Sequence, residues 1–333
     1  MRVCLPGCIR LWFSGTVVPQ REDVSFMTAS TQRNAWLEER IRSLILDAPG
    51  NRLPDFDDQP VFDAPLVGVA RGDDPLFEEF IEIVSDRHFL PCRLLEESAG
   101  RRIDPAAVRV VSWANPFTAA IRQSNRGELP SRLYSLARNN GAALIHRAQA
   151  QLRGLIEAEG FAAVVPSALA QYDTFRSPRD TFSSTWSERH VAFAAGLGQF
   201  GLNAALITPV GINVRFGSIV TELPLEPTPR IYEDYRAPCL RSGGRECGQC
   251  VAKCPAGAIT SQGLDKEKCY EMRQFIRKKF LDVYPRELQM IELDVVKSGR
   301  RKSSYSLGCA LCQCGVPCER SMPVLGSAGD ADA

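Results

Sequence analysis

The chain has 333 residues, 44% of them hydrophobic and 24% charged, and its 40 basic and 39 acidic side chains leave a net charge of +1. This balance argues against a protein that binds polyanions through its overall charge, and no apolar run approaches the ~18 residues of a membrane span. The length is sufficient for two domains of about 100–150 residues each.

The first 26 residues differ from the rest. Their apolar run is interrupted by Pro6, Gly7 and Arg10, and it lacks the pattern of a secretory signal peptide. A more regular sequence begins at Met27. We therefore interpret residues 1–26 as an N-terminal extension that is either disordered or part of an over-extended start, and we expect a cytoplasmic protein.

Two helices are predicted next. Residues 34–47 place four aliphatic side chains on one helical face, and the helix should end at the Asp-Ala-Pro-Gly sequence that begins at Asp47. Residues 73–84 predict a second helix, with Asp73 or Asp74 as its cap and Pro75 in its first turn. The inward positions of the first helix are Leu37, Ile41, Leu44 and Ile45.

Strands then alternate with a long helix. Residues 108–116 read as a buried strand that ends at proline, and residues 161–166 and 215–223 as two further strands. Between them, residues 142–160 predict a helix that stops at Gly160. This alternation indicates a mixed α/β core that ends near residue 230. The side chains expected to point inward from the helix are Ile145, Ala148, Leu152, Leu155 and Ile156.

Nine of the twelve cysteines lie between residues 239 and 318. A C-x2-C-x3-C-P run from Cys247 to Pro255 matches part of the ligand run of bacterial two-cluster ferredoxins, in which the last cysteine crosses to the other cluster. The short spacing suits thiolates that wrap a compact iron–sulfur cube. We predict two [4Fe–4S] clusters, held by Cys239, Cys247, Cys250 and Cys318 in one set and by Cys254, Cys269, Cys309 and Cys312 in the other, with Cys314 left over.

Two other uses of these cysteines are possible. A zinc ribbon would employ the C-x2-C pairs at 247/250 and 309/312, but it would leave five nearby cysteines unexplained. Disulfides are uncommon in a cytoplasmic protein. Both interpretations account for fewer of the cysteines than two clusters do.

Two shorter motifs suggest other ligands. Residues 196–201, GLGQFG, satisfy the G-x-G-x-x-G pattern of dinucleotide sites, with VAFAA as a possible preceding strand, but Pro209 and Gly211 leave no room for the helix that must follow. The sequence Asp86-x-His88-x2-Pro91 is similar to a histidine motif that supplies a cobalt ligand, although a proline replaces the glycine. We expect this histidine to face solvent or cap a helix.

Read together, TWSERH (185–190), GLGQFGLN (196–203), CGQCVAKCPAGAI (247–259) and GCALCQCGVPCE (308–319) resemble the epoxyqueuosine reductase family and the related corrinoid-dependent reductive dehalogenases. The resemblance covers most of residues 105–322. It implies a nitroreductase-like, corrinoid-binding α/β (α+β) core at residues 27–230, a two-[4Fe–4S] ferredoxin-like domain at 231–322, and a tail at 323–333. In that family the clusters pass electrons to a base-off cobalamin.

The resemblance also implies where cobalamin would bind. The glycines would let the backbone lie flat against the corrin ring, since glycine has no side chain. The cofactor-binding residues predicted in this way are Thr185, Trp186, Ser187, Arg189, His190, Gly196, Gly198, Gly201 and Asn203.

The chain departs from the family at its proton donor. Epoxyqueuosine reductases carry an aspartate in a G-x-D-Y-H segment, and the corresponding residues 133–148 contain no acidic residue. The candidates for the catalytic acid are Tyr134, His146 and Glu188. Each also has a structural interpretation: a packed tyrosine with its hydroxyl in water, a surface histidine on a helix, and a carboxylate at a helix start.

The helical-repeat region that helps many family members hold tRNA has no counterpart after Cys318. We therefore expect a small organic substrate or a modified nucleoside rather than tRNA, and an electron-donor protein such as a flavodoxin or ferredoxin as partner. The sequence thus predicts an iron–sulfur, cobalamin-dependent reductase. The alternative is a ferredoxin-like electron carrier or docking protein without bound corrinoid.

Overall fold

The computed structural model describes residues 30–177, 182–231, 234–283, 291–297, 300–304 and 308–323. The predictions about the N-terminal extension, Met27 and the first two cysteines lie outside these residues, as does most of the predicted tail. Within them, no helix is both long and apolar enough to pass through a bilayer.

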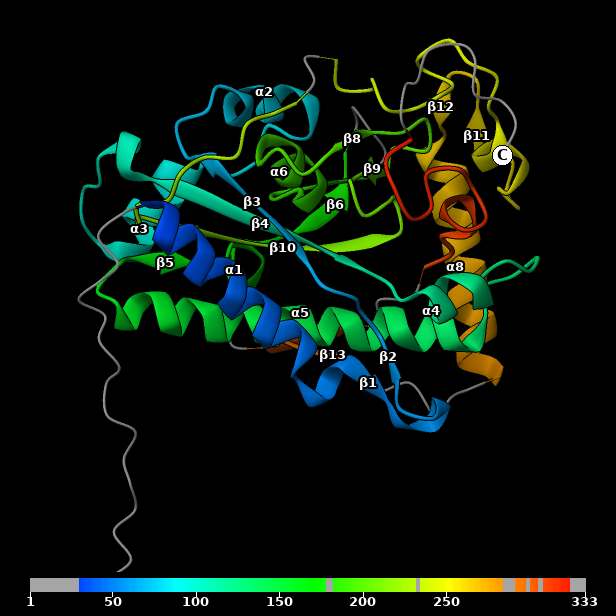
Figure 1. Cartoon of the computed structure of the whole chain (residues 1–333), viewed down its shortest axis with the longest axis horizontal. Coiled ribbons are helices and arrows are strands. Elements are labelled where there is room, and N and C mark those ends of the chain that lie inside the picture. Colours follow the sequence, from blue (N-terminus) through cyan, green and yellow to red (C-terminus); the bar gives the residue numbers. More distant parts are fainter. Residues whose placement is uncertain are drawn as a thin grey trace, which may run out of the picture.

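The centre of the molecule is a four-stranded sheet in the order β3-β4-β10-β5 (Figure 1). Its strands are β3 (Leu66–Arg71), β4 (Arg109–Pro116), β10 (Val214–Thr221) and β5 (Ala163–Val164). Every pairing is antiparallel. The three predicted strands are therefore confirmed, and the mixed α/β fold is of the α+β kind, because antiparallel pairs do not require a crossover helix between strands.

Helices cover both faces of this sheet (Figure 1). On one face lie α1 (Ser30–Leu46) and α5 (Arg132–Ala158), which pack Leu37, Ile41 and Leu152 against Trp113 and Ile219 of the sheet. On the other face lie α2 (Leu76–Ile83), α3 (Pro91–Ala99) and α6 (Glu188–Ala194). The sheet is thus buried on both sides, which explains why β4 reads as a nearly continuous apolar run.

The helix α5 is longer than predicted. It begins at Arg132 because the Ser131 hydroxyl accepts a hydrogen bond from the Tyr134 backbone N–H at 3.0 Å, a regular N-cap. The inward prediction for Leu155 is wrong, since this side chain is 38% exposed while Leu152 and Ile156 are fully buried. At 100° per residue, Leu155 lies at the rim of the stripe that its neighbours define.

In helix α2 the N-cap position is Pro75, one residue after the predicted cap, and the Leu76 backbone N–H donates to the Asp74 carboxylate at 3.1 Å. The remaining helical turns of the core are η2 (Pro49–Asn51), η3 (Pro54–Phe56), η4 (Pro105–Ala107), α4 (Ala119–Ser124) and η5 (Pro166–Ala168). Its small hairpins pair β1 (Arg52–Leu53) with β2 (Gln59–Pro60), β6 (Thr174–Arg176) with β7 (Phe182–Ser184), and β8 (Gln199–Phe200) with β9 (Leu206–Ile207).

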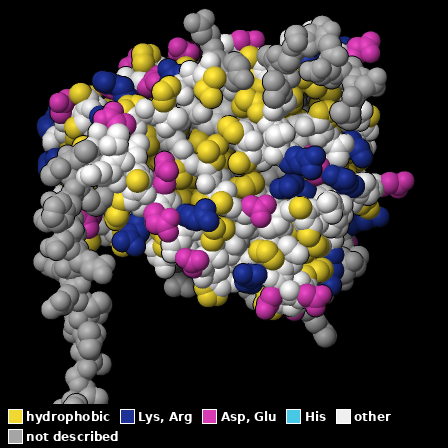
Figure 2. Space-filling model, viewed as in Figure 1, with side chains coloured by type: hydrophobic (Ala, Val, Ile, Leu, Met, Phe, Trp, Pro, Cys, Tyr) yellow, Lys and Arg dark blue, Asp and Glu magenta, His cyan; other side chains and the backbone are white. Residues whose placement is uncertain are grey.

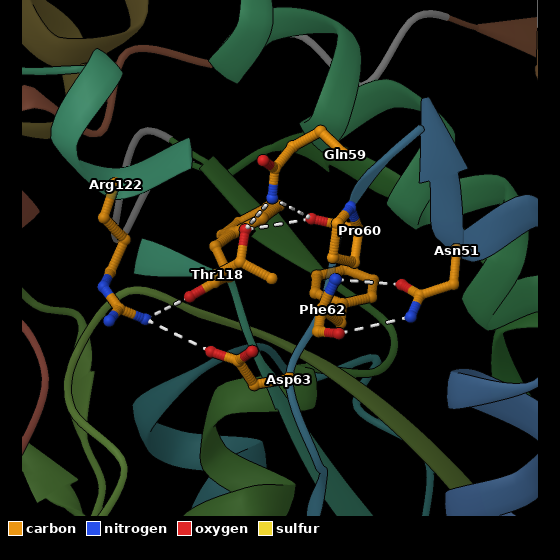
Figure 3. A network of polar contacts seen from close by, with 8 residues as sticks. Asn51, Gln59, Pro60, Phe62, Asp63, Thr118 and Arg122 are labelled. Atoms are coloured by element: carbon orange, nitrogen blue, oxygen red, sulfur yellow. Dashed lines mark hydrogen bonds and ion pairs between the residues drawn. The ribbon is translucent and has the colours of Figure 1, made fainter. Parts of the chain in front are cut away.

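A polar network ties the segment after α1 to the start of α4 (Figure 3). The Asn51 amide donates to the Phe62 carbonyl at 3.2 Å and accepts from the Phe62 N–H at 2.9 Å. The Thr118 hydroxyl donates to the Pro60 carbonyl at 2.9 Å. The Arg122 guanidinium donates to the backbone carbonyl of Phe117, the residue before Thr118. Because α4 is anchored in this way, the following loop and the start of α5 are held in place.

The cysteine-rich part follows residue 234. It contains α7 (Gln249–Ala252), β11 (Ile259–Thr260), β12 (Gly263–Leu264), α8 (Lys266–Val283), β13 (Ile291–Lys297), β14 (Arg300–Ser304) and η6 (Leu311–Gln313). It packs on the core at Gly211, whose φ of +96° and close approach to Glu319 exclude a side chain, and the Ile212 N–H donates to the Cys318 carbonyl at 2.8 Å. The division near residue 230 remains a prediction.

Candidate functional site

The first cysteine group consists of Cys239, Cys247, Cys250 and Cys318, which line one cavity with about 420 Å³ of atom-free space, partly open to solvent. Burial, with the neighbouring thiols of Cys239 and Cys247, raises the pKa of Cys250 to about 11. The pKa of Cys318 rises to about 12, through burial and the Cys239 and Cys250 thiols. The structure thus brings together four thiols, of which the first and the last, Cys239 and Cys318, are 79 positions apart in the sequence.

The second cysteine group consists of Cys254, Cys269, Cys309 and Cys312. Burial raises the pKa of Cys309 to about 11, and the thiols of Cys269 and Cys254 add to the shift. The pKa of Cys312 is raised further, first by burial and then by the thiols of Cys309, Cys269 and Cys254. Each group therefore contains the four cysteines that the sequence assigned to one cluster.

This grouping separates the two C-x2-C pairs of the zinc-ribbon alternative, since one pair lies in each group. Among the described residues, no three His, Cys, Asp or Glu side chains stand as ligands of a single metal ion. A set of four cysteine thiols is the usual donor set of a [4Fe–4S] cluster. The chemistry of both groups therefore fits that cofactor.

The left-over Cys314 belongs to neither group. It is fully buried, and its sulfur accepts hydrogen bonds from the amide of Asn213 at 2.9 Å and from that of Asn125 at 3.5 Å. The Tyr134 hydroxyl donates to the other end of the Asn213 amide at 3.3 Å. This cysteine therefore anchors the η6 loop in the core beside α5.

The three candidate acids come together around a residue that sequence reasoning did not single out. Glu188, Tyr134 and His146 each lie close enough to Arg215 for its charge to shift their pKa, and Tyr172 joins them. We call Tyr134, His146, Tyr172, Glu188 and Arg215 the inner polar cluster. All except Tyr134 keep some solvent exposure. The sequence signal that could have identified Arg215 is its position as a charged residue near the start of an otherwise apolar strand.

One edge of β10 is largely unpaired, and this explains why side chains from two different helices lie near Arg215. Strand β5 pairs only with Val220 and Thr221, so Val214–Ile219 have β4 on one side and no strand among the described residues on the other. The Gln149 amide donates to the Ser218 carbonyl at 3.0 Å along this edge. Side chains from α5 and α6 can therefore reach Arg215 around the strand.

Glu188 is the group in this cluster that titrates near neutral pH. Burial raises its pKa to about 7, although a hydrogen bond from Ser218 and the charge of Arg215 oppose the shift. The Ser218 hydroxyl also accepts from the Trp186 indole N–H at 2.9 Å, which fixes its position. One carboxyl oxygen, Oε2, is buried without a hydrogen-bond partner among the described residues.

The structural interpretations of the other two candidates are wrong. Tyr134 is fully buried, so its hydroxyl does not reach water, and burial raises its pKa well above 10. His146 is partly buried rather than fully exposed, and burial and then the charge of Arg215 lower its pKa to about 4. At neutral pH the histidine is thus uncharged and the tyrosine protonated.

Residues 185–190 serve the protein's own packing to a large extent. Thr185 and Trp186 are buried in the core, and the Thr185 hydroxyl accepts from the Asp173 N–H at 2.9 Å. Ser187 and His190 form a hydrogen bond with each other at 2.7 Å, and Arg189 donates to the Ala204 carbonyl. Two predicted cofactor-binding side chains therefore face protein rather than an open site.

The predicted glycines also have packing reasons. A Cβ on Gly198 would stand 2.2 Å from the Ile207 carbonyl oxygen, and one on Gly196, whose φ is +74°, would stand 2.9 Å from the Pro229 carbonyl oxygen. At Gly201 it would lie 3.1 Å from Asn203, whose amide donates to the Cys312 carbonyl at 3.2 Å. Asn203 thus touches the second cysteine group.

The alternative motifs are resolved by the fold. VAFAA forms part of α6 rather than a strand, so GLGQFG does not follow a strand as a dinucleotide site requires. His88 is 4% exposed, which contradicts a solvent-facing position. Its Nε2 accepts from the Ser187 N–H at 3.2 Å, and its ring stacks on Trp186 at 5.5 Å.

Comparison with known proteins confirms the predicted resemblance to epoxyqueuosine reductases. No family model matches the chain. The epoxyqueuosine reductase of Bacillus cereus is 39% identical over 85 residues, and that of Bacillus anthracis 36% identical over 85 residues; both matches cover 25% of this chain. The matched stretch spans only a fifth (20%) of the length of these relatives.

Solved structures of the same kind are similar in part. Epoxyqueuosine reductase from Bacillus subtilis is 16% identical, with a TM-score of 0.47 over 89% of this chain and 68% of that protein. An epoxyqueuosine reductase with a tRNA stem loop gives 17% identity and a TM-score of 0.40 over 74% and 58%. A catabolic reductive dehalogenase gives 16% and 0.38 over 62% and 27%.

Proposed function

We propose that this chain is an iron–sulfur oxidoreductase, similar to epoxyqueuosine reductases, that delivers electrons to the inner polar cluster. The observation that carries the proposal is the gathering of eight cysteines into two groups of four, in which Cys254 of one sequence run joins Cys269 and the later pair. Such crossing of ligands between runs is typical of two-cluster ferredoxin-like domains.

The first cysteine group would hold one [4Fe–4S] cluster and the second group the other. When bound, the clusters supply single electrons. The second group borders the inner polar cluster, because the thiols of Cys269 and Cys309 feel the charge of Arg138, which in turn neighbours Arg215. A reducible substrate at the inner polar cluster would therefore lie next to the electron source.

The chain's own residues would manage the proton. With a pKa of about 7, Glu188 is protonated in a large share of molecules at neutral pH and can donate its proton. Arg215, whose pKa of about 9 keeps it charged, would stabilise the carboxylate that remains. Neutral His146 would offer a hydrogen bond that orients the substrate, whereas the hydroxyl of the buried Tyr134 already donates to Asn213.

Cobalamin is the electron acceptor that the resemblance implies, and we keep it as part of the proposal. The residues predicted to bind it, however, do not form an open cradle: Thr185 and Trp186 are in the core, and Gly196, Gly198 and Gly201 face protein. We therefore derive no step through this cofactor.

The packing of residues 185–201 is also the observation that favours the second candidate function, a ferredoxin-like electron carrier without corrinoid. Against it stands the inner polar cluster. A carrier has no use for a partly buried glutamic acid with a pKa near neutrality beside a partly buried arginine, whereas such perturbed groups are typical of catalytic sites.

The substrate class follows from the resemblance: a small organic molecule or a modified nucleoside. For the electron donor we propose an acidic protein such as a flavodoxin or ferredoxin. Its docking place would be an open pocket with about 1160 Å³ of atom-free space beside Cys254 and Cys312. It is lined by Arg126, Gly127, Glu128, Leu129, Ala252, Lys253, Pro255, Phe275 and Leu311.

This pocket combines basic and exposed apolar side chains, as a docking surface requires. Leu129 is 43% and Phe275 47% exposed, and the pocket is also lined by Lys253 and by Arg126, which is ion-paired with Glu319. Lysine and arginine side chains gather on this side of the molecule, where α4, α8 and the cysteine-rich residues lie (Figure 2).

An anaerobic EPR experiment tests the proposal. The clusters are reconstituted, cob(II)alamin is added, and its spectrum is recorded with and without protein. Conversion of the five-coordinate base-on signal to a base-off signal supports a corrinoid enzyme. An unchanged cobalamin signal beside two reducible clusters supports the carrier, and a protein that binds no clusters contradicts both functions.

A further inference from the structure

Two arginines separate the second cysteine group from the inner polar cluster. Arg138 lies one turn after Tyr134 on α5, and its guanidinium packs directly against Gly308, the residue before Cys309. A Cβ on Gly308 would stand 2.5 Å from the Arg138 Nε and 2.8 Å from its Cζ. A side chain at this position would therefore displace the guanidinium from where it lies.

Arg273 reaches the same place from the other side. It follows Cys269 by four residues on α8, so both side chains lie on one helical face. Burial lowers the pKa of Arg273, and among its neighbours Arg138 and the thiols of Cys269 and Cys309 also influence it. Two guanidinium groups thus face the second cysteine group together, although each disfavours the charge of the other.

Among the described residues, no cation contributes to the pKa shifts of Cys250 and Cys318 in the first cysteine group. Arg241 lines its cavity but is solvent-exposed, and water and salt screen an exposed charge strongly. The thiols that shift the pKa of Cys250 and Cys318 are those of their own group. The two groups therefore differ in the sign and the screening of the charges around them.

We propose that Arg138 and Arg273 raise the reduction potential of the cluster in the second cysteine group above that of the first. The inference rests on the proposed function, because it requires both clusters. A cluster gains one negative charge when it takes up an electron, so a fixed positive charge nearby stabilises the reduced form. Electrons entering at either cluster then collect beside the inner polar cluster. Arg138 and Arg273 are positioning residues for the electron, not catalytic ones.

The test is an EPR-monitored redox titration of the whole reconstituted chain. Arg138→Met removes the charge, Arg138→Lys keeps it, and Gly308→Ala displaces the guanidinium without removing it. Arg147→Met makes the same change nine residues further along α5, about 13 Å away by helical rise, and serves as the control.

We expect Arg138→Met to lower the reduction potential of the higher-potential cluster by about 59 mV or more. For one electron, this shift corresponds to a tenfold change in the reduction equilibrium constant. Gly308→Ala should shift it in the same direction, Arg138→Lys should restore most of it, and Arg147→Met should leave both potentials unchanged. The lower-potential cluster should not respond.

Equal shifts in the Met and Lys variants would show a structural effect and overturn the inference, as would potentials that do not respond to Arg138→Met. In both cases two titratable clusters remain, so the proposed function stands. If the wild-type chain binds no clusters, the proposed function fails, and this inference fails with it.

Discussion

Glu188 shows how one residue acquires a role that its position in sequence does not reveal. As the first residue of α6 it could simply favour the helix N-terminus. Its surroundings give it a second property: protein encloses the carboxyl, Ser218 donates to it, and Arg215 lies near. Desolvation outweighs both stabilising contacts, so the carboxyl takes up a proton at a pH where ordinary glutamates are ionised.

This shift predicts a pH dependence of stability. The Glu188 pKa is about 7 in the folded state and 4.5 ordinarily, so the folded state binds the proton more tightly, and stability falls as pH rises through this window. Relative to Glu188→Gln, the wild type should lose roughly 1–3 kcal/mol between pH 4.5 and 7. Thermal denaturation of both proteins across this range measures it.

Conversely, a constant difference in melting temperature between wild type and Glu188→Gln would mean that the carboxyl titrates normally. Glu157→Gln, at an exposed glutamate on α5 that is paired with Arg153, is the matched control for the substitution itself.

At the scale of elements, the decisive arrangement is the packing of α5 on β10. Gly217 on β10 leaves space for Trp113 and Ile145, since a Cβ there would stand 2.7 Å from the indole and 2.9 Å from the isoleucine. The close approach leaves Tyr134 and His146 of α5 near enough to Arg215 of β10 for its charge to influence the pKa of both. A larger residue at Gly217 would push the helix from the sheet.

We therefore expect Gly217→Ala to destabilise the protein by about 1–3 kcal/mol, because the core is overpacked. Gly154→Ala on α5 is the matched variant. No atom lies within 4 Å of its added methyl group, and alanine favours the helix, so it should stabilise by about 0.5–1 kcal/mol. Chemical denaturation of both variants, followed by far-UV circular dichroism, tests the pair; equal effects would contradict the packing.

At the scale of the whole molecule, the cysteine-rich part places its two groups in different surroundings. The second group lies against α5 and the inner polar cluster, and the first opens on a cavity lined also by Leu202, Asn203 and Ile212 of the core. The basic pocket around Lys253 and Phe275 lies beside the second group. The proposed docking site of the electron donor and the proposed substrate site would thus lie on different sides of the second cysteine group.

The proposed docking predicts that Lys253→Glu and Phe275→Ser slow reduction of the clusters by an acidic flavodoxin about tenfold at low salt, with the charge effect fading at high salt. Reduction by dithionite, which needs no docking, should be unchanged. The controls are Arg102→Glu and Ile83→Ser, exposed residues of the same types. Stopped-flow absorbance gives the rates; equal slowing by the controls would exclude a specific surface.

The sequence by itself determined the features that depend on local order. Apolar periodicity predicted β4, β10, α1 and α2, because the 2.0 and 3.6 repeats are properties of single elements. Cysteine spacing with an adjacent proline predicted both groups of four, because short spacings restrict which thiols can meet. The motifs also predicted the resemblance to epoxyqueuosine reductases.

Only the tertiary structure decided which side chains share one environment. Tyr134, His146 and Glu188 looked like separate candidates until β10 placed Arg215 among them, and Trp186 looked like a ligand until the core enclosed it. Burial and charge act through space between residues that are far apart in sequence. No local pattern encodes them, so the pKa of each group and the charge around each cysteine group emerge only when the helices close on the sheet.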